Sequence, residues 1–437
     1  MLFKNIAVLK EDCSFAQDAD VRSEGGYIVS VAPGGTSVAS GGERVIDGKG
    51  KLLMPAFYNA HTHLPMILMR GYGENMKLMD WLEKKIFPFE DKITGPDCYN
   101  ASMLAIAESF SHGVVSSSDM YFFCEDIIRA AAESGAKLNV SRGLSYFDEI
   151  LDLTGFRPYR EAKDLFFEHH DTQEGRIRVE MSLHAEYTAT PGLIEAVAGL
   201  VRETGAPVHV HVSETQSEHE ECKKRYEGRT PTRVFSDGGV FDNGGIAIHC
   251  VWIDEEDTDL LKEKGVTVVS CPVSNMKLAN GFARVPLILE KGVNVALGTD
   301  GAASNNSFNF FEEMKTLSLA AKARFGDPTL IKPCEALFAA TRAGALAQGR
   351  PDCGFIKEGF RADMIVLDLT APSMNPVYEI ANNLVYSASS RDILMTVADG
   401  RVVYENGEYP TIDVEKAVSE TGRSCKRILK DLAEGTS

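Results

Sequence analysis

Long hydrophobic runs are missing from this chain, although 44% of its 437 residues are hydrophobic. No apolar stretch approaches the roughly 18 residues that are needed to cross a bilayer. Residues 1–5 also lack the apolar core and the small-residue cleavage site of a signal peptide. We therefore expect a cytoplasmic protein with no membrane partner.

Paired cysteine motifs are also lacking. The nine cysteines are scattered, odd in number and never spaced as Cys-x-x-Cys. This pattern argues against a disulfide framework and against a zinc site built from thiolates. It indicates a reducing compartment.

Positive charge is scarce: 45 Lys and Arg residues face 63 Asp and Glu residues, which leaves a net charge of −18. Because like charges repel, this balance argues against a nucleic-acid partner and against an anionic lipid surface. The charged fraction of 25% is ordinary for a globular enzyme. The length allows a large barrel together with a smaller domain.

The two ends of the chain share a pattern of short strands and turns that the middle lacks. Asp399-Gly400, between two β-branched segments, is typical of a hairpin turn. We predict one small β-sandwich domain built from residues 1–55 and 355–410. Apolar residues at helical spacing predict a C-terminal helix within residues 411–437.

The middle of the chain, residues 56–354, alternates between strands and helices. Eight apolar, β-branched runs are typical of strands that are buried on both faces. These runs end near His63, Asp119, Arg142, His184, Glu214, Trp252, Asn275 and Asp300. The alternation predicts an α/β fold with a (β/α)8 TIM-like barrel, whose active site lies at the carboxyl ends of the strands. An open doubly wound sheet is the alternative, but no Gly-x-Gly-x-x-Gly loop follows an early strand.

Histidines gather at these strand ends. His61 and His63 are two residues apart on one strand, so both side chains project to the same face. With His211 and Asp300 they form a set of three nitrogens and one oxygen, which suits a divalent transition metal with an open position for water. We expect one metal ion, zinc first, with iron, nickel or manganese as alternatives.

Two further side chains are placed to act on water bound by that metal, whose pKa falls toward ~7. Glu214 follows His211 by three residues and can move protons between water and substrate. His249 can hydrogen-bond the attacking oxygen. His209 lies one layer deeper than His211, and we interpret it as a core histidine or as support for a ligand.

The motifs resemble those of the amidohydrolase superfamily, in its mononuclear aminohydrolase branch. The resemblance is carried by PAFYNAHTH at residues 55–63, HVSE at 211–214, IHC at 248–250 and GTD at 298–300. It extends to about residue 405 and implies the barrel with a β-sandwich, and hydrolysis at an sp2 carbon that bears an amino group. Barrels of this kind are often oligomeric, so we expect a homo-oligomer.

Within that branch the chain looks most like the 5-methylthioadenosine/S-adenosylhomocysteine deaminases, through residues 80–82 and 87–91. The resemblance implies a small-molecule purine nucleoside as substrate. It also implies that Glu90 accepts hydrogen bonds from the ribose and that Trp81 packs against apolar substrate atoms.

Further substrate contacts are implied for His184, Arg142 and Arg160. His184 would bind the purine ring, and the two arginines would bind a homocysteine carboxylate through charge-assisted hydrogen bonds. A structural ion pair remains the alternative for Arg142.

The implied reaction removes the amino group from C6 of a 5′-modified adenosine and yields the inosine analogue and ammonia. Glu214 would protonate N1, and Asp300 would pass the remaining proton to the ammonia. The main alternative is another aminohydrolase or chlorohydrolase that acts on guanine, a pterin or an s-triazine, which offers Glu90 no ribose. A non-catalytic barrel scaffold is disfavoured, because every ligand position is filled.

Overall fold

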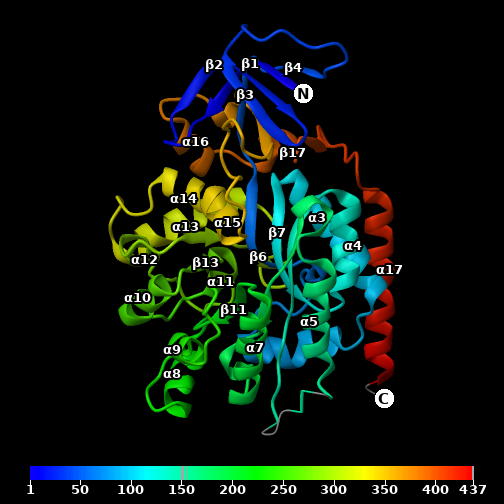
Figure 1. Ribbon diagram of the computed structural model, residues 1–437, viewed down its shortest axis with the longest axis vertical. Helices are drawn as coiled ribbons and strands as arrows, with labels where there is room; N and C mark the ends of the chain where they lie inside the picture. Colours follow the sequence, from blue (N-terminus) through cyan, green and yellow to red (C-terminus); the bar gives the residue numbers. More distant parts are fainter. Residues whose placement is uncertain (149–151, 154, 436–437) are drawn as a thin grey trace.

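The computed structural model describes residues 1–148, 152–153 and 155–435. The described strands form three sheets. Figure 1 shows strands from both ends of the chain at one end of the molecule, with a larger body of strands and helices below them.

The first sheet joins the two ends of the chain. Its strands are β1 (Leu2–Leu9), β2 (Phe15–Glu24), β3 (Tyr27–Pro33), β4 (Val45–Asp47), β5 (Lys51–Pro55), β16 (Met364–Asp368), β17 (Ile393–Ala398) and β18 (Arg401–Glu405). They follow the order β18-β17-β16-β5-β1-β2-β3, with β4 beside β1. Strands from both ends of the chain therefore lie in one sheet. The structure shows a single sheet here, where the sequence predicts a sandwich of two layers. Alternation in a sequence reveals which side chains are buried, but not whether a sheet folds into two layers.

The other two sheets supply all eight strand runs that the sequence predicts. They contain β6 (Phe57–His63), β7 (Val114–Tyr121), β8 (Lys137–Arg142), β9 (Ile177–Val179), β10 (Met181–Leu183), β11 (Val208–Val212), β12 (Gly245–His249), β13 (Val266–Ser270), β14 (Val295–Leu297) and β15 (Asp300–Gly301). One has the order β15-β6-β7-β8-β9 and the other β10-β11-β12-β13-β14. All their pairings are parallel.

Two of the predicted runs are interrupted. Glu180 separates β9 from β10, and residues 298–299 separate β14 from β15. At Gly298 the backbone passes so close to His61 that an added Cβ would lie 2.9 Å from the His61 Cβ. The hydrogen-bonded strands thus form two sheets that meet at both interruptions, and strand pairing alone does not confirm the closed barrel.

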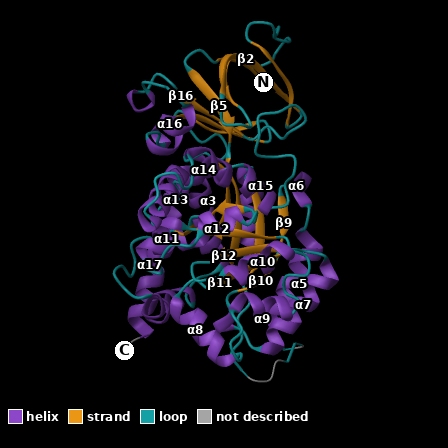
Figure 2. Ribbon diagram, turned by 90° about the vertical axis from the view of Figure 1, so that its left-hand side faces the viewer, coloured by secondary structure: helices purple, strands orange, loops and turns teal. Residues whose placement is uncertain are grey.

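Helices surround the strands of the larger body (Figure 2). The helices are α1 (Leu78–Trp81), α2 (Phe87–Glu90), α3 (Gly95–Ser111), α4 (Cys124–Ser134), α5 (Arg157–His169), α6 (Thr172–Gly175), α7 (Pro191–Thr204), α8 (Gln216–Arg225), α9 (Pro231–Asp237), α10 (Glu255–Glu263), α11 (Pro272–Lys277), α12 (Val285–Glu290), α13 (Phe310–Phe325), α14 (Pro333–Ala340), α15 (Arg342–Ala347), α16 (Ile380–Tyr386) and α17 (Val414–Gly435). The 3-10 helices are η1 (Leu64–Met69), η3 (Glu186–Thr188), η4 (Pro372–Met374) and η5 (Ser390–Asp392), and η2 (Leu82–Ile86) is a π-helix. Helices α7, α8 and α10 begin where Thr190, Thr215 and Asp254 accept a hydrogen bond from a backbone amide of the first turn.

The C-terminal helix α17 packs along α3, at the edge of the body in Figure 1. Ile428 is fully buried, and Arg427 binds Asp97 of α3 at 2.5 Å. None of the described helices combines the length and the apolar character that a membrane span requires.

Cysteine pairing departs from the sequence-based expectation at one place. Cys13, in the turn after β1, forms a disulfide with Cys334 at the start of α14. The two residues are 321 positions apart, so no spacing motif could reveal the pair. The other seven cysteines, all within the described residues, are free. The disulfide joins the terminal sheet to the helical body.

Candidate active site

A cavity of about 1000 Å³ opens beside the carboxyl ends of the parallel strands. The strand-end residues on its wall are His63, Tyr121, Arg142, His184, His211, His249 and Asp300. This volume lies at the upper end of the range of about 300–1,000 Å³ typical of small-molecule sites.

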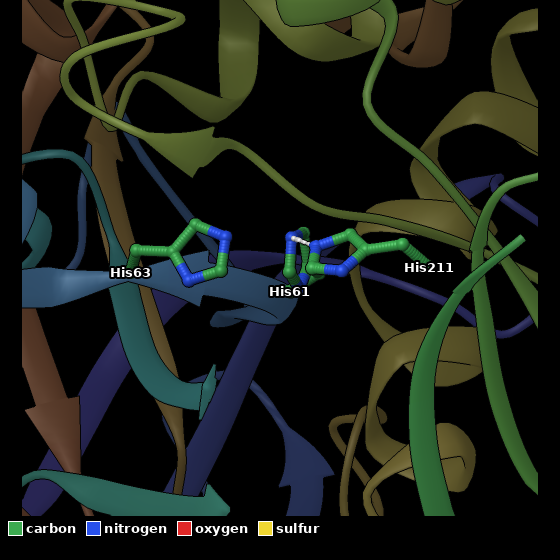
Figure 3. Close-up of side chains that lie close together, drawn as sticks. All are labelled: His61, His63 and His211. Atoms are coloured by element: carbon green, nitrogen blue, oxygen red, sulfur yellow. Dashed lines mark hydrogen bonds between the residues drawn. The ribbon is translucent and has the colours of Figure 1, made fainter. Parts of the chain in front are cut away.

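Three imidazoles lie close together (Figure 3), and two of them, His63 and His211, line the cavity. His61 and His63 come from the end of β6, and His211 comes from β11. One ring nitrogen of each lies within 4.8 Å of the others, an arrangement that could hold a metal ion. The Nε2 atoms of His61 and His211 are 3.3 Å apart.

The remaining ring nitrogens are bound to neighbours. His63 Nδ1 lies 2.6 Å from the Met120 carbonyl oxygen, and His211 Nδ1 lies 2.7 Å from the His184 carbonyl oxygen. Because a carbonyl only accepts, these Nδ1 atoms carry the hydrogen and Nε2 keeps a free lone pair. His61 Nδ1 contacts His209 Nε2 at 2.9 Å.

His209 lies behind the cluster, as the sequence suggests. Its Nδ1 lies 2.9 Å from Glu180 Oε2, and both residues are buried. Glu180, which interrupts the strand between β9 and β10, thereby orients His209 and through it His61. Chains of this kind fix the tautomer and direction of a metal-binding histidine.

Asp300 completes the cluster from β15. Its Oδ1 lies 3.4 Å from Nε2 of both His61 and His63. Its Oδ2 accepts hydrogen bonds from Ser274 Oγ at 2.6 Å and Ser304 Oγ at 2.8 Å. Burial alone would raise the pKa of Asp300, but the neighbouring histidines hold it well below its usual value.

Burial also lowers the pKa values of His61 and His211 well below that of a free imidazole. Both rings are therefore neutral near pH 7, which is the form that binds metal ions. A carboxylate surrounded by neutral imidazoles is a suitable donor set for a divalent transition metal.

Glu214 and His249 lie next to this cluster. Glu214 Oε1 accepts a hydrogen bond from Asn280 Nδ2 at 2.7 Å, and its Oε2 lies 3.7 Å from His249 Nε2. His249 Nδ1 lies 2.8 Å from Asn275 Oδ1. Burial and repulsion by Asp300 raise the pKa of Glu214 to about 8.

The backbone is strained at two of these positions. His249 has φ 67° and Asp300 has φ 60°, both in the left-handed region that residues other than glycine rarely adopt. Such a conformation costs about 1–3 kcal/mol and clusters at functional sites. It turns both side chains toward the cavity where the strands end.

Four of the five residues that the resemblance assigns to substrate binding alone line the cavity, and one does not. Trp81, Glu90, Arg142 and His184 line the cavity. Arg160 is exposed on α5 and is not among the described residues of the cavity wall.

The wall from α5 instead contains Arg157, Pro158, Glu161, Asp164, Leu165 and Glu168. This spacing of three or four residues marks one face of a helix, and the sequence alone did not place that face against the cavity.

Several supporting residues escaped the sequence analysis. Asn275 and Asn280 follow the carboxyl end of β13, so their position after a predicted strand was a usable signal. Ser274 and Ser304 bind Asp300 but resemble ordinary loop serines in the sequence. Glu180 lies inside a predicted strand, and nothing in the sequence distinguishes it from an ordinary strand residue.

Several known proteins are similar to this chain over most of its length. Residues 52–403 match the amidohydrolase family. A 5-methylthioadenosine/S-adenosylhomocysteine deaminase of Dictyoglomus thermophilum is 40% identical over 386 residues, which cover 88% of this chain and 89% of that protein. A 5′-deoxyadenosine deaminase of Methanosarcina mazei is 36% identical over 431 residues, which cover 98% of each.

A solved structure is also similar over nearly its whole length. It is an adenosine deaminase from Xanthomonas campestris with bound zinc, 30% identical, with a TM-score of 0.92 and coverage of 98% of both chains. The family match and the two deaminase relatives each span most of the chain. This chain belongs to the amidohydrolase family.

Proposed function

We propose that this protein is a metal-dependent aminohydrolase that deaminates 5′-modified adenosines to the inosine analogues and ammonia. The observation that carries the proposal is the joining of the histidine cluster, Glu214 and His249 at the floor of one large cavity. Relatives at 36–40% identity are named as deaminases of such nucleosides.

His61, His63, His211 and Asp300 would hold one divalent metal ion. Their donor atoms fit such an ion, because the Nδ1 atoms of the three histidines are bound to neighbours. Nε2 of His61 lies 3.4 Å from Asp300 Oδ1 and 3.3 Å from Nε2 of His211. Nε2 of His63 also lies 3.4 Å from Asp300 Oδ1. Zinc is our first choice, with iron, nickel or manganese as alternatives. When bound, such an ion lowers the pKa of water toward ~7 and so supplies the nucleophile.

The protein's own groups would then move the protons. Glu214 holds a proton at neutral pH and would deliver it to N1 of the adenine ring, so that C6 accepts the attacking oxygen. Asp300 would take the remaining proton from that oxygen and pass it to the departing ammonia. His249, held by Asn275, would hydrogen-bond the oxygen at C6.

The cavity wall supports a nucleoside as the substrate. Glu90 would accept hydrogen bonds from the ribose hydroxyls, and Trp81 would pack against apolar atoms. His184 would bind the purine ring. Arg142 lines the cavity and would face the 5′ substituent, whereas the position of Arg160 offers this role no support.

We also propose that the two five-stranded sheets form one (β/α)8 barrel over residues 56–354. Only Glu180 separates β9 from β10, two residues separate β14 from β15, and β15 pairs with β6. Residues 1–55 and 355–410 would form a β-sandwich, because the terminal sheet encloses an apolar core of its own. Residues 411–437 would be the C-terminal helix.

Seven of the nine cysteines are free and only Cys13 and Cys334 are paired, a balance that favours a cytoplasmic location. Enzymes with such barrels often form homo-oligomers. Size-exclusion chromatography with light scattering measures the oligomeric state directly.

Glu214→Gln tests the proposed function. We expect the variant to keep its metal and to lose turnover by about 10²–10⁴-fold, because the general acid is gone. The measurement combines metal analysis with a spectrophotometric screen of adenosine derivatives, guanine, pterins and s-triazines. Near-normal turnover in the variant, or turnover of free bases alone, would contradict the proposal.

A further inference from the structure

Arg142 lies on the cavity wall at the end of β8, but its guanidinium already has protein partners. Arg142 Nε binds Glu161 Oε2 at 2.9 Å, and Nη1 donates to the Gly143 carbonyl oxygen at 2.7 Å. The guanidinium also lies over the Phe122 ring, 5.0 Å from its centre. The carboxylate of Glu161 therefore occupies an edge of Arg142 that a substrate carboxylate would use.

A second arginine holds Glu161 in place. Arg157, one turn earlier on α5, binds Glu161 Oε1 at 2.6 Å through its Nε. Glu161 thus uses both oxygens at once, one on each arginine. Partial burial would raise the pKa of Glu161, but Arg142 and Arg157 lower it below its usual value, so the side chain is ionised near neutral pH.

The same wall is acidic around this ion pair. Asp164 follows Glu161 by three residues on the cavity face of α5. A carboxylate or phosphate on the substrate would have to displace Glu161 from Arg142 and then lie beside Glu161 and Asp164. Replacing one carboxylate on Arg142 by another gains little, whereas these like charges oppose it.

We propose that Glu161 determines substrate specificity by occupying Arg142, and that it selects nucleosides whose 5′ substituent carries no carboxylate or phosphate. The inference rests on the proposed function and names its substrate class. Uncharged 5′ groups, as in 5′-deoxyadenosine and 5-methylthioadenosine, bind beside this wall without displacing Glu161. S-adenosylhomocysteine is disfavoured, and a nucleoside 5′-phosphate is the poorest substrate.

The ion pair is sheltered enough to discriminate between substrates. The side chain of Arg142 is 15% exposed and that of Glu161 is 35% exposed, so solvent screens the pair only in part. Glu168 gives a matched control, since it carries the same charge on the same wall, two turns farther along α5.

The test compares kcat/KM for S-adenosylhomocysteine with kcat/KM for 5′-deoxyadenosine in the metal-loaded enzyme. We expect Glu161→Gln and Glu161→Ala to raise this ratio by about five- to tenfold, as for the release of one half-buried ion pair. The gain lies in a lower KM for S-adenosylhomocysteine. Glu168→Gln should change the ratio by less than about twofold, because surface charge acts weakly through solvent.

An unchanged or lower ratio in both Glu161 variants would overturn the inference, provided that their thermal unfolding matches that of the wild type. If the wild type converts 5′-deoxyadenosine but the ratio does not move, only this inference fails. If the wild type converts no adenosine derivative, the proposed function itself fails.

Discussion

At His61, His63 and His211 the direction of each imidazole is set by the atom bound to its other nitrogen. Two of these atoms are backbone carbonyl oxygens, and the third is Nε2 of His209. These contacts with other protein atoms fix the directions of the three rings, which lowers the cost of ordering them as ligands of a metal ion.

Glu90 should make substrate binding depend on pH. Burial raises the pKa of Glu90 to about 7, although the neighbouring Tyr121 hydroxyl opposes the shift. Below that pH the carboxyl is protonated, and above it the ionised group would accept hydrogen bonds from both ribose hydroxyls. We expect KM for 5′-deoxyadenosine to fall as the pH rises through about 7. Steady-state kinetics between pH 6 and 9 measure this profile.

Glu90→Gln is the control for that profile, because it keeps the shape of the side chain but cannot ionise. Its KM should be higher and independent of pH over the same range. A profile that persists in this variant would assign the titration to another group. The raised pKa also means that ionising Glu90 costs stability, so its contribution to folding declines as the pH rises from about 4.3 toward 7.

Individual residues were predictable where they stand at the end of a strand. His61, His211 and Asp300 meet in the structure because carboxyl ends of parallel strands share one edge. Arg160 was assigned by resemblance, in a region where loop length varies, and α5 places Arg157 on the wall instead. The partner of Arg142 comes from a helix 19 residues away, which no local pattern reveals.

At the scale of elements, the sequence predicts the eight strand runs well, because strands buried on both faces are continuously apolar. It misses the two interruptions. Glu180 interrupts its strand while binding His209, and Gly298 does so while passing close to His61. Both interruptions serve the active site, so they depend on contacts between segments far apart in the sequence.

Helix α17 is an element whose contribution to stability can be measured. Ile428 is fully buried, whereas the neighbouring Leu429 is 46% exposed. We expect Ile428→Ala to lower the free energy of unfolding by about 2–4 kcal/mol, since it removes buried methylene groups and leaves a cavity. Leu429→Ala, a similar truncation one residue away, should change it by less than about 0.5 kcal/mol. Urea unfolding measures both, and equal effects would mean that α17 does not dock as described.

At the scale of the whole molecule, a buried ion cluster joins the terminal sheet to the body. Lys137 at the start of β8 lies 2.5 Å from Asp363 and 2.7 Å from Asp399, which flank β16 and β17. Tyr58 of β6 donates a hydrogen bond to Asp363. The disulfide of Cys13 joins the same two parts at another point. Charges and cysteines more than 200 residues apart carry no sequence signal of such contacts.

Lys137→Met should therefore destabilise the whole protein at neutral pH. It leaves Asp363 buried without its cation, and removing one partner of such a pair costs about 3–5 kcal/mol. Lys430→Met, which removes an exposed lysine 3.6 Å from Glu434, is the control and should cost less than about 1 kcal/mol. Thermal or urea unfolding at pH 7 measures both variants.

The pH dependence of this loss separates a charge effect from a packing effect. Burial raises the pKa of Asp363, but Lys137 and the surrounding hydrogen bonds hold it below its usual value. The lowered pKa of Asp363 stabilises the folded protein at pH values above about 3.9, the pKa of Asp in an unfolded chain. This stabilisation is lost as the pH falls through the pKa of Asp363 in the folded protein. In Lys137→Met the buried carboxyl can protonate as the pH falls, which removes the unpaired charge. The deficit of the variant should thus be smaller at pH 5 than at pH 7, whereas a deficit that stays constant would assign the loss to packing of the lysine chain.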